Sequence, residues 1–386
     1  MRIALLMSVA SPWSRDIALQ VQRAGHEVHV IDPTNSETIN YIGRDDKSQQ
    51  AAMLALRQSV AAIHSIQCDG RGRLVAVYLA WRLRRILREI HADVLSTLYG
   101  GTFAAAAYLS TFRPYAIYVV GSDILVGGRF KKRASRIALS GASIVFSNGR
   151  YLAKKTQEVA PHANIMPLYV GTDTALFTPA IRKPSPITIV CSRGFLPVYN
   201  NELLIRALSF MPRNLRDYET IFAGPGPDLD KARALADQVL SGEQRRNVQF
   251  LGGVSREELG RLLGEAHIYV SVSRSDGTSL SLTEALSCGA FPILSDIPAN
   301  REWVDAAAHN GILVPTDDPV ELAQALARAI GDETLRRAAS GYNRQLVLER
   351  ADQESNMATF ARELARCKGA PTSFIEASNA SRTQAR

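Results

Sequence analysis

The sequence predicts an α/β protein of two doubly wound domains, each built around a parallel β-sheet. Three observations lead to this fold class. The chain has 386 residues, 46% of them hydrophobic and 21% charged, which is enough for two or three domains with complete cores. Short apolar runs alternate with helical patterns, as they do when helices cover both faces of parallel strands. A stiff proline-rich segment, residues 178–186, divides this alternation into two halves.

The first half opens with a strand–helix–strand unit. Residues 2–7 are apolar, a helical pattern follows until Gly25, and residues 26–32 alternate as a strand. A signal peptide over residues 1–10 is the alternative, but its apolar core would be barely long enough and would lead directly into this unit. Further strands are expected at 92–97, 115–120, 143–147 and 164–168.

The second half repeats the alternation from residue 187 onward. Strands are expected at 187–191, 219–223, 248–251, 268–272 and 291–295, and helices at 202–210, 229–240, 257–265 and 281–287. The expected organisation is a first domain at 1–180, a second at 181–340, a C-terminal helix at 341–366 and a disordered tail at 367–386. Ligands of such sheets bind at the carboxyl ends of the strands, so a site in the cleft between the domains is expected.

Charge and cysteine content limit the function classes. Residues 1–180 carry 21 Lys and Arg against 12 Asp and Glu, whereas residues 181–386 carry 24 against 25. The first domain is therefore expected to face an anionic partner: nucleic acid, an acidic substrate or an anionic membrane surface. The four cysteines are too widely spread for a disulfide framework or a local metal site. No apolar run approaches the roughly 20 residues of a membrane span.

Residues 271–289 are the segment most informative about chemistry, because they form a strand, a loop of small residues and a helix that ends at Gly289. Unpaired N–H groups at the start of such a helix suit a diphosphate. Asp276 lies on the loop and Glu284 one to two turns into the helix, so both can face one ligand. A capped helix with a solvated Asp and a surface Glu would give the same pattern, so this segment alone leaves both interpretations open.

The second half resembles the retaining GT-B glycosyltransferases of family 4 along almost its whole length. Their signature is an acidic residue, seven residues and a Glu, then Ala, a small-Cys-Gly stop and a strand; it is matched by Asp276 to Glu284 and residues 285–294. Further matches lie at 121–125, 171–179, 223–227, 248–252 and 310–315. The resemblance implies a GT-B fold of two Rossmann-like domains that face a cleft.

The resemblance also implies roles for individual residues. Arg193 would bind the diphosphate and stabilise the leaving-group charge, and Asp276 would contact the donor sugar, so both are the expected catalytic residues. Glu284 would hold the ribose hydroxyls. The other donor-binding candidates are Gly277, Thr278, Ser279, Leu280, Tyr199 and Gly224. On the acceptor side the candidates are Ser122 and Asp123.

Three positions depart from the family pattern. Asp276 stands where Glu is usual, Tyr199 lies in the short segment where a phosphate-binding Lys often follows the Arg, and Val120 replaces a frequent His. The Gly224-Pro225-Gly226 segment is more often a strand-to-helix turn than a phosphate cradle. Dinucleotide and P-loop motifs are missing, and the seven histidines are scattered, so neither a metal nor a cofactor is expected.

Residues 71–90 predict an amphipathic helix with an unusual outer face. One side is a normal core stripe, whereas the other carries six arginines interleaved with Leu, Val, Tyr and Trp. Solvated arginines packed on neighbouring loops are one interpretation; the other is an anionic lipid surface, with residues 131–133 extending the patch. The membrane-facing candidates are Trp81, Arg84, Arg85 and Arg88.

The resemblance and this helix together predict a metal-independent, retaining hexosyltransferase. It would move a hexose from a UDP-hexose or GDP-mannose to a lipid-linked or saccharide acceptor in cell-envelope or exopolysaccharide synthesis. We expect it in the cytoplasm, peripheral on the cytoplasmic face of an anionic membrane, without a nucleic-acid partner. The alternatives are a nucleotide-sugar epimerase or phosphorylase of the same fold, a non-catalytic nucleotide-sugar-binding protein, and a basic nucleic-acid-binding module.

Overall fold

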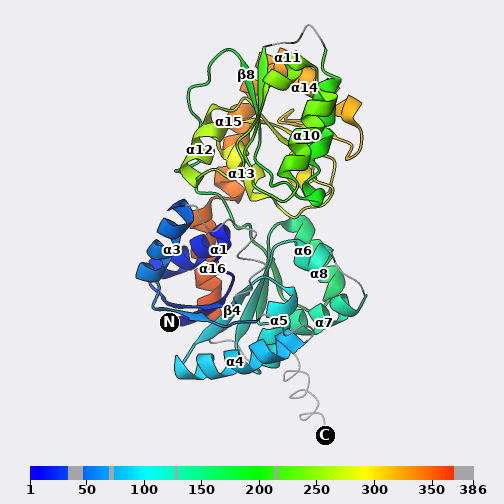
Figure 1. Cartoon of the computed structure of the whole chain (residues 1–386). Helices are drawn as coiled ribbons and strands as arrows, with labels where there is room; N and C mark the ends of the chain where they lie inside the picture. Colours follow the sequence, from blue (N-terminus) through cyan, green and yellow to red (C-terminus); the bar gives the residue numbers. More distant parts are fainter. Residues whose placement is uncertain (34–46, 69–73, 127–128, 213–214, 216, 369–386) are drawn as a thin grey trace. The chain divides into compact units, whose positions relative to one another are not determined.

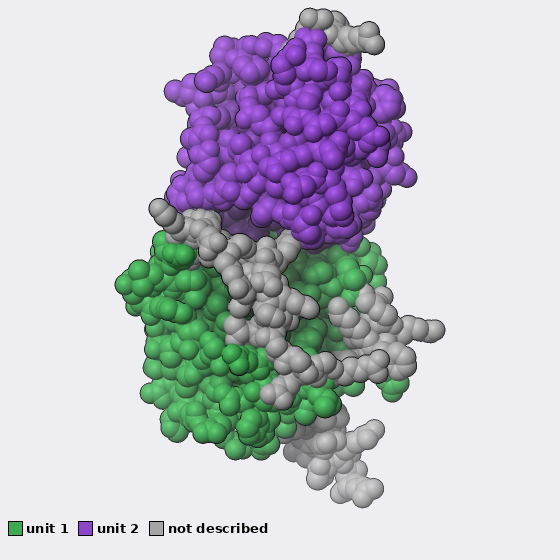
Figure 2. Space-filling model, in the orientation of Figure 1, with its two compact units in different colours: residues 1–170, 354–386 green, residues 171–353 purple. Residues whose placement is uncertain are grey.

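The computed structural model describes residues 1–33, 47–68, 74–126, 129–212, 215 and 217–368 (Figure 1). The chain forms two compact units, which are Met1–Val170 with Glu354–Arg386, and Gly171–Gln353 (Figure 2). Each unit is a parallel sheet covered by helices on both faces. The predicted class, two doubly wound α/β domains, is confirmed.

Unit 1 is built on a seven-stranded sheet in the order β3-β2-β1-β4-β5-β6-β7, in which every neighbouring pair is parallel. The strands are β1 Arg2–Leu6, β2 Glu27–Asp32, β3 Ala62–Ser65, β4 Val94–Leu98, β5 Tyr115–Val119, β6 Ile144–Ser147 and β7 Ile165–Pro167. The helices are α1 Pro12–Arg23, α3 Lys47–Ser59, α4 Val75–Glu89, α5 Gly101–Leu109, α6 Ser122–Leu125, α7 Arg129–Ser140 and α8 Arg150–Val159. Helices α4, α5, α7 and α8 share one face of the sheet (Figure 1).

Unit 2 is built on a six-stranded parallel sheet in the order β10-β9-β8-β11-β12-β13. The strands are β8 Ile187–Cys191, β9 Tyr218–Phe222, β10 Val248–Phe250, β11 Ile268–Ser271, β12 Phe291–Ser295 and β13 Ile312–Val314. The helices are η2 Pro197–Tyr199, α9 Asn201–Ser209, α10 Leu229–Val239, α11 Gly242–Arg246, α12 Arg256–Glu265, α13 Leu280–Ser287, η3 Asn300–Glu302, α14 Pro319–Gly331 and α15 Glu333–Arg350. Because strand order reverses between β8 and β11, the loops that follow these two strands flank the topological switch point.

The boundary between the units precedes the proline-rich segment at which the sequence predicts it. Residues 171–180 belong to unit 2 because hydrogen bonds fasten them there: the Thr172 hydroxyl donates to Thr283 at 2.7 Å, and the Ala180 N–H donates to the Gly264 carbonyl at 3.1 Å. The expected boundary at residue 180 is therefore displaced to Gly171.

The C-terminal helix is also organised differently from the prediction. The chain forms two helices, α15 and α16 Gln353–Cys367, separated at Ala351 and Asp352. The break is held by the Asp352 carboxylate, which accepts a hydrogen bond of 2.8 Å from the Thr174 hydroxyl. Helix α16 then returns to unit 1, where the Phe360 ring packs edge-on against Phe146 and Tyr118. The predicted tail beyond residue 368 lies outside the described residues.

Candidate functional site

The predicted donor-side residues come together at the switch point of unit 2. Arg193 follows β8, and Asp276 lies on the loop between β11 and α13. The two side chains are 83 positions apart, yet an Arg193 guanidinium nitrogen donates to an Asp276 carboxylate oxygen at 2.5 Å. The sheet topology therefore builds the pair, since both loops leave the carboxyl edge of adjacent strands.

A network of hydroxyl groups fixes the Arg193 guanidinium. Besides Asp276, it donates to the Ser279 hydroxyl and, at 3.2 Å, to the Ser281 hydroxyl. The Tyr269 hydroxyl in turn donates to Ser281 at 2.8 Å. Burial raises the pKa of Tyr269 to about 12, so its hydroxyl stays protonated and remains a donor at neutral pH. Arg193 is thus a buried cation held in one orientation, which suits a group that must meet a phosphate.

The Asp276 carboxylate is the counter-charge of this cation. Burial raises its pKa, while Arg193 and the Gly277 N–H counteract that rise by favouring the ionised form. The side chain is one-fifth exposed, so its carboxylate combines the ion pair with access to a ligand.

Tyr199 stands over the same guanidinium. The Arg193 guanidinium carbon lies 3.9 Å from the centre of the Tyr199 ring, a close cation–π arrangement. The Tyr199 loop is tied to the Asp276 loop by two bonds from Arg274, whose N–H donates to the Val198 carbonyl at 2.9 Å and whose guanidinium donates to the Pro197 carbonyl at 2.6 Å. The aromatic side chain at this position orients Arg193 and adds no second cation.

The backbone of Gly224 packs closely against the loop that carries Arg193. A Cβ atom at this position would collide with the Arg193 carbonyl, and one at Gly226 would collide with the Phe195 backbone. The Phe195 N–H also donates to the Pro225 carbonyl at 2.8 Å. The turn is therefore a close backbone packing that places Arg193, in agreement with the structural interpretation of its sequence.

The start of α13 lies directly beside the ion pair. Ser279 occupies the N-cap position, but its side chain makes no capping bond because it is engaged with Arg193 and Ser281. The backbone amides expected to meet a diphosphate are those of Gly277 to Leu280, and the first two of these residues, Gly277 and Thr278, are buried. Glu284 is half-buried in the second turn. Burial raises the pKa of Cys288 to about 12, and the negative charge of Glu284 is the second largest cause of that rise.

Two members of this cluster were missed by sequence reasoning. Tyr269 reads as an ordinary buried strand residue, and Ser281 reads as a small residue in the first turn of a helix. Their hydrogen bond depends on the distance between β11 and α13, which no local pattern encodes. The two-residue spacing of Ser279 and Ser281 is the one signal that could have indicated a shared partner.

The acceptor-side candidates of unit 1 organise its loops. The Asp123 side chain is 2% exposed, and its carboxylate accepts bonds of 2.8 Å from both the Gly100 and Gly121 N–H groups. The exposed Ser122 hydroxyl lies 3.1 Å from the Tyr99 hydroxyl. Asp123 therefore fixes the loops after β4 and β5.

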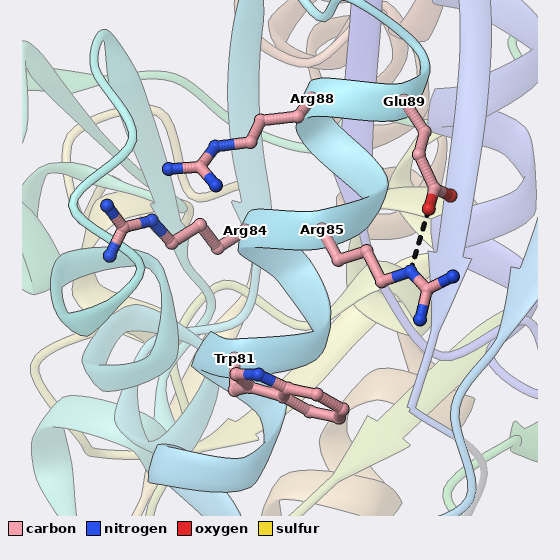
Figure 3. A pocket seen from close by; sticks show the side chains of 5 residues that line it. All are labelled: Trp81, Arg84, Arg85, Arg88 and Glu89. Atoms are coloured by element: carbon pink, nitrogen blue, oxygen red, sulfur yellow. Dashed lines mark hydrogen bonds and ion pairs between the residues drawn. The ribbon is translucent and has the colours of Figure 1, made fainter.

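The membrane-facing candidates also lie together, on the outer face of α4. Trp81, Arg84, Arg85 and Arg88 are all exposed and, with Glu89, line one pocket (Figure 3). Arg71 and Arg73, which the sequence analysis counts in the same patch, lie outside the described residues, as do the side chains of Lys131 and Lys132.

Among the described residues, no group of three His, Cys, Asp or Glu side chains is arranged to hold a metal ion. Within the same part of the chain, none of the helices combines the length and the apolar character that crossing a bilayer requires.

Residues 174–346 match the family described as "Glycosyl transferases group 1". A GDP-mannose:cellobiosyl-diphosphopolyprenol alpha-mannosyltransferase of Xanthomonas oryzae pv. oryzae is 34% identical over 36% of this chain and 38% of its own length. A GDP-mannose-dependent monoacylated alpha-(1-6)-phosphatidylinositol monomannoside mannosyltransferase of Corynebacterium glutamicum is 25% identical over 58% of this chain and 61% of its own length. The match thus spans less than two thirds of either relative.

Solved structures resemble the whole chain. A glycosyltransferase from Rickettsia africae superposes with a TM-score of 0.76 at 14% identity, covering 96% of this chain and 99% of that one. Anabaena HepE in complex with UDP gives 0.74 at 16% identity, over 95% and 100% of the two chains. At such identities the likeness establishes the fold alone, and the fold is GT-B.

Proposed function

We propose that the chain is a retaining glycosyltransferase whose donor binds in unit 2, since residues 174–346 match the family described as "Glycosyl transferases group 1". The observation that carries this proposal is the ion-paired, hydroxyl-fixed Arg193 beside the start of α13 at the switch point. A buried cation next to helix amides is complementary to the two negative charges on the diphosphate of a nucleotide-sugar.

The proposed roles follow from these positions. Arg193 and the α13 amides hold the diphosphate, and Glu284 accepts the ribose hydroxyls from the second turn of the same helix. As the glycosidic bond breaks, negative charge grows on the departing phosphate, and a cation already in place stabilises it without reorganisation. The departing phosphate itself takes the acceptor proton, so no side chain is proposed as a covalent nucleophile.

The donor and acceptor are proposed by class. The Xanthomonas and Corynebacterium relatives are named for GDP-mannose as donor and for lipid-linked acceptors, so GDP-mannose is the first donor to test, followed by UDP-hexoses. A lipid-linked acceptor would place the protein at the cytoplasmic face of a membrane. The proposed reaction needs no metal, because Arg193 and the helix amides supply the positive charge.

Transfer from labelled nucleotide-sugars to a membrane-lipid extract tests the proposal. Arg193→Ala and Glu284→Ala should each lower transfer at least ~10²-fold, which corresponds to about 2.7 kcal/mol of transition-state stabilisation. Exposed Arg301, which pairs with Asp296 in the same unit, provides the matched control, and Arg301→Ala should leave transfer unchanged. EDTA should have no effect. Donor turnover without an acceptor would indicate an epimerase or phosphorylase, and activity lost with EDTA would refute the metal-free step.

A further inference from the structure

The outer face of α4 carries an exposed apolar stripe. Leu74, Val77 and Trp81 are 69%, 58% and 59% exposed. Their spacing of three and four residues places them on one side of the helix, opposite the buried Leu79 and Leu83. An ordinary surface helix is polar on that side, so three large apolar residues in a row indicate a surface that another phase or partner covers.

Arginines continue the same stripe toward the end of the helix. Arg84 and Arg88 extend to one side, whereas Arg85 turns to the other and pairs with Glu89 at 2.8 Å (Figure 3). Among the described residues, neither Arg84 nor Arg88 has an acidic partner. With Trp81 they border an open pocket of ≈ 270 Å³. Two guanidinium groups without an acidic partner, beside an exposed indole ring, form a surface that is both cationic and apolar.

Another helix of the same layer, α7, carries similar exposed side chains. Helix α5 packs between α4 and α7 on the same face of the sheet (Figure 1). On α7, Arg133, Arg136 and Ile137 are exposed. A second helix therefore repeats the combination of arginine and large apolar side chain.

We propose that the outer face of α4 docks unit 1 on a bilayer that contains anionic phospholipids. Arg84 and Arg88 bind lipid phosphates, and Leu74, Val77 and Trp81 enter the headgroup layer, where indole rings are favoured. A nucleic-acid backbone would match the two arginines but would leave the apolar stripe against phosphates and water. The inference rests on the proposed function only in that docking would present a lipid-linked acceptor to the enzyme.

Vesicle sedimentation with the full-length protein tests the docking surface. We expect the protein to sediment with phosphatidylcholine vesicles containing about one-third phosphatidylglycerol, but not with phosphatidylcholine alone, and to be released by salt. Each unpaired arginine contributes about fivefold to partition, so R84Q/R88Q should bind about 30-fold more weakly. Trp81→Ala should weaken binding and Trp81→Phe should largely retain it.

The paired residues on the same helix are the matched controls. Arg85→Gln should change partition much less than Arg84→Gln, because Glu89 already neutralises Arg85. Glu89→Gln should strengthen partition about fivefold by freeing that arginine. All variants should keep wild-type binding of GDP or UDP, measured by thermal shift, so a loss of vesicle binding is separated from a failure of the donor site.

Three outcomes would overturn the inference. The first is equal partition to neutral and anionic vesicles, and the second is no effect of R84Q/R88Q. The third is a different ligand for the same arginines: displacement by millimolar inorganic phosphate, or tighter binding to a DNA duplex or to a protein, each with the same dependence on Arg84 and Arg88.

Discussion

The ion pair between Arg193 and Asp276 leads to the most quantitative prediction. Asp276→Asn keeps the shape of the side chain but leaves the buried Arg193 guanidinium without its counter-charge. Removing one partner of a buried pair costs roughly 3–5 kcal/mol. Because Asp276 is one-fifth exposed and Ser279 and Ser281 remain bound to Arg193, we expect about 3 kcal/mol.

A bound nucleoside diphosphate should compensate for this loss of stability, because its negative charges replace the missing carboxylate. In the wild type, a ligand at 100 times its Kd adds about 2.7 kcal/mol to the free energy of unfolding. The gain caused by GDP or UDP should be larger in Asp276→Asn than in the wild type. These nucleotides lack the sugar, so a lost contact between Asp276 and the donor sugar does not enter the comparison.

Urea unfolding followed by Trp303 fluorescence measures both effects in unit 2. Trp303 is buried in that unit, and replacing Trp13 and Trp81 of unit 1 by Phe removes the other tryptophan signals. Asp296→Asn is the matched control, because it breaks the exposed pair with Arg301 and should change stability little. An Asp276→Asn variant as stable as this control would show that the carboxylate does not stabilise Arg193. Equal stabilisation of Asp276→Asn and the wild type by GDP or UDP would show that the diphosphate does not replace it.

Other predictions concern buried titrating groups and backbone packing. Burial raises the pKa of Asp32 to about 6, so the folded protein loses stability as pH rises from about 4 to above 6 and this carboxyl ionises. Asp32→Asn should therefore add up to about 3 kcal/mol to the free energy of unfolding at pH 8 and nothing at pH 3.5, measured by urea unfolding. Burial lowers the pKa of His267, so the free energy of unfolding should fall as pH drops from 6.5 through the folded-state pKa of this group. An NMR titration that gives His267 a pKa above its ordinary value would contradict this prediction. Gly224→Ala should destabilise unit 2 by about 1–3 kcal/mol and weaken GDP binding, because a Cβ there meets the Arg193 carbonyl, whereas Gly331→Ala, with open space around it, should do neither.

Buried strands were the most predictable part of the fold. Strands β8 and β12 have the predicted bounds, because each is a short apolar run between turn residues. Strands β3 and β13 were missed, because they are edge strands of four and three residues with half-exposed side chains. Strands this short contain too few alternating apolar and polar residues to be distinguished from loops by sequence.

The domain boundary depended on contacts that local composition does not encode. Proline marks a stiff segment, but hydrogen bonds from Thr172 and Ala180 attach the residues before it to unit 2. The break between α15 and α16 likewise depends on the bond between Thr174 and Asp352, which are 178 positions apart. Helical periodicity alone continues across that break.

The candidate site was predictable as a set of residues but not as a network. The positions of Arg193, Asp276 and Glu284 after strands and on one helix follow from the motif and the alternation of elements. The direct pairing of Arg193 with Asp276 follows from the adjacency of β8 and β11, which is a property of the sheet. The sequence also groups Arg84, Arg85 and Arg88 as candidates for facing a membrane, whereas the structure distinguishes them: within the described residues Arg85 pairs with Glu89, and Arg84 and Arg88 have no acidic partner.

The cluster around Arg193 is proposed to hold a nucleoside diphosphate without a metal, and titration calorimetry of GDP and UDP in EDTA measures that binding. At least one of the two nucleotides should bind the wild type, Arg193→Gln and Glu284→Gln should each weaken binding at least tenfold, and Arg301→Gln should bind as the wild type does. Binding that requires a divalent metal, or that is unchanged in Arg193→Gln, would contradict it.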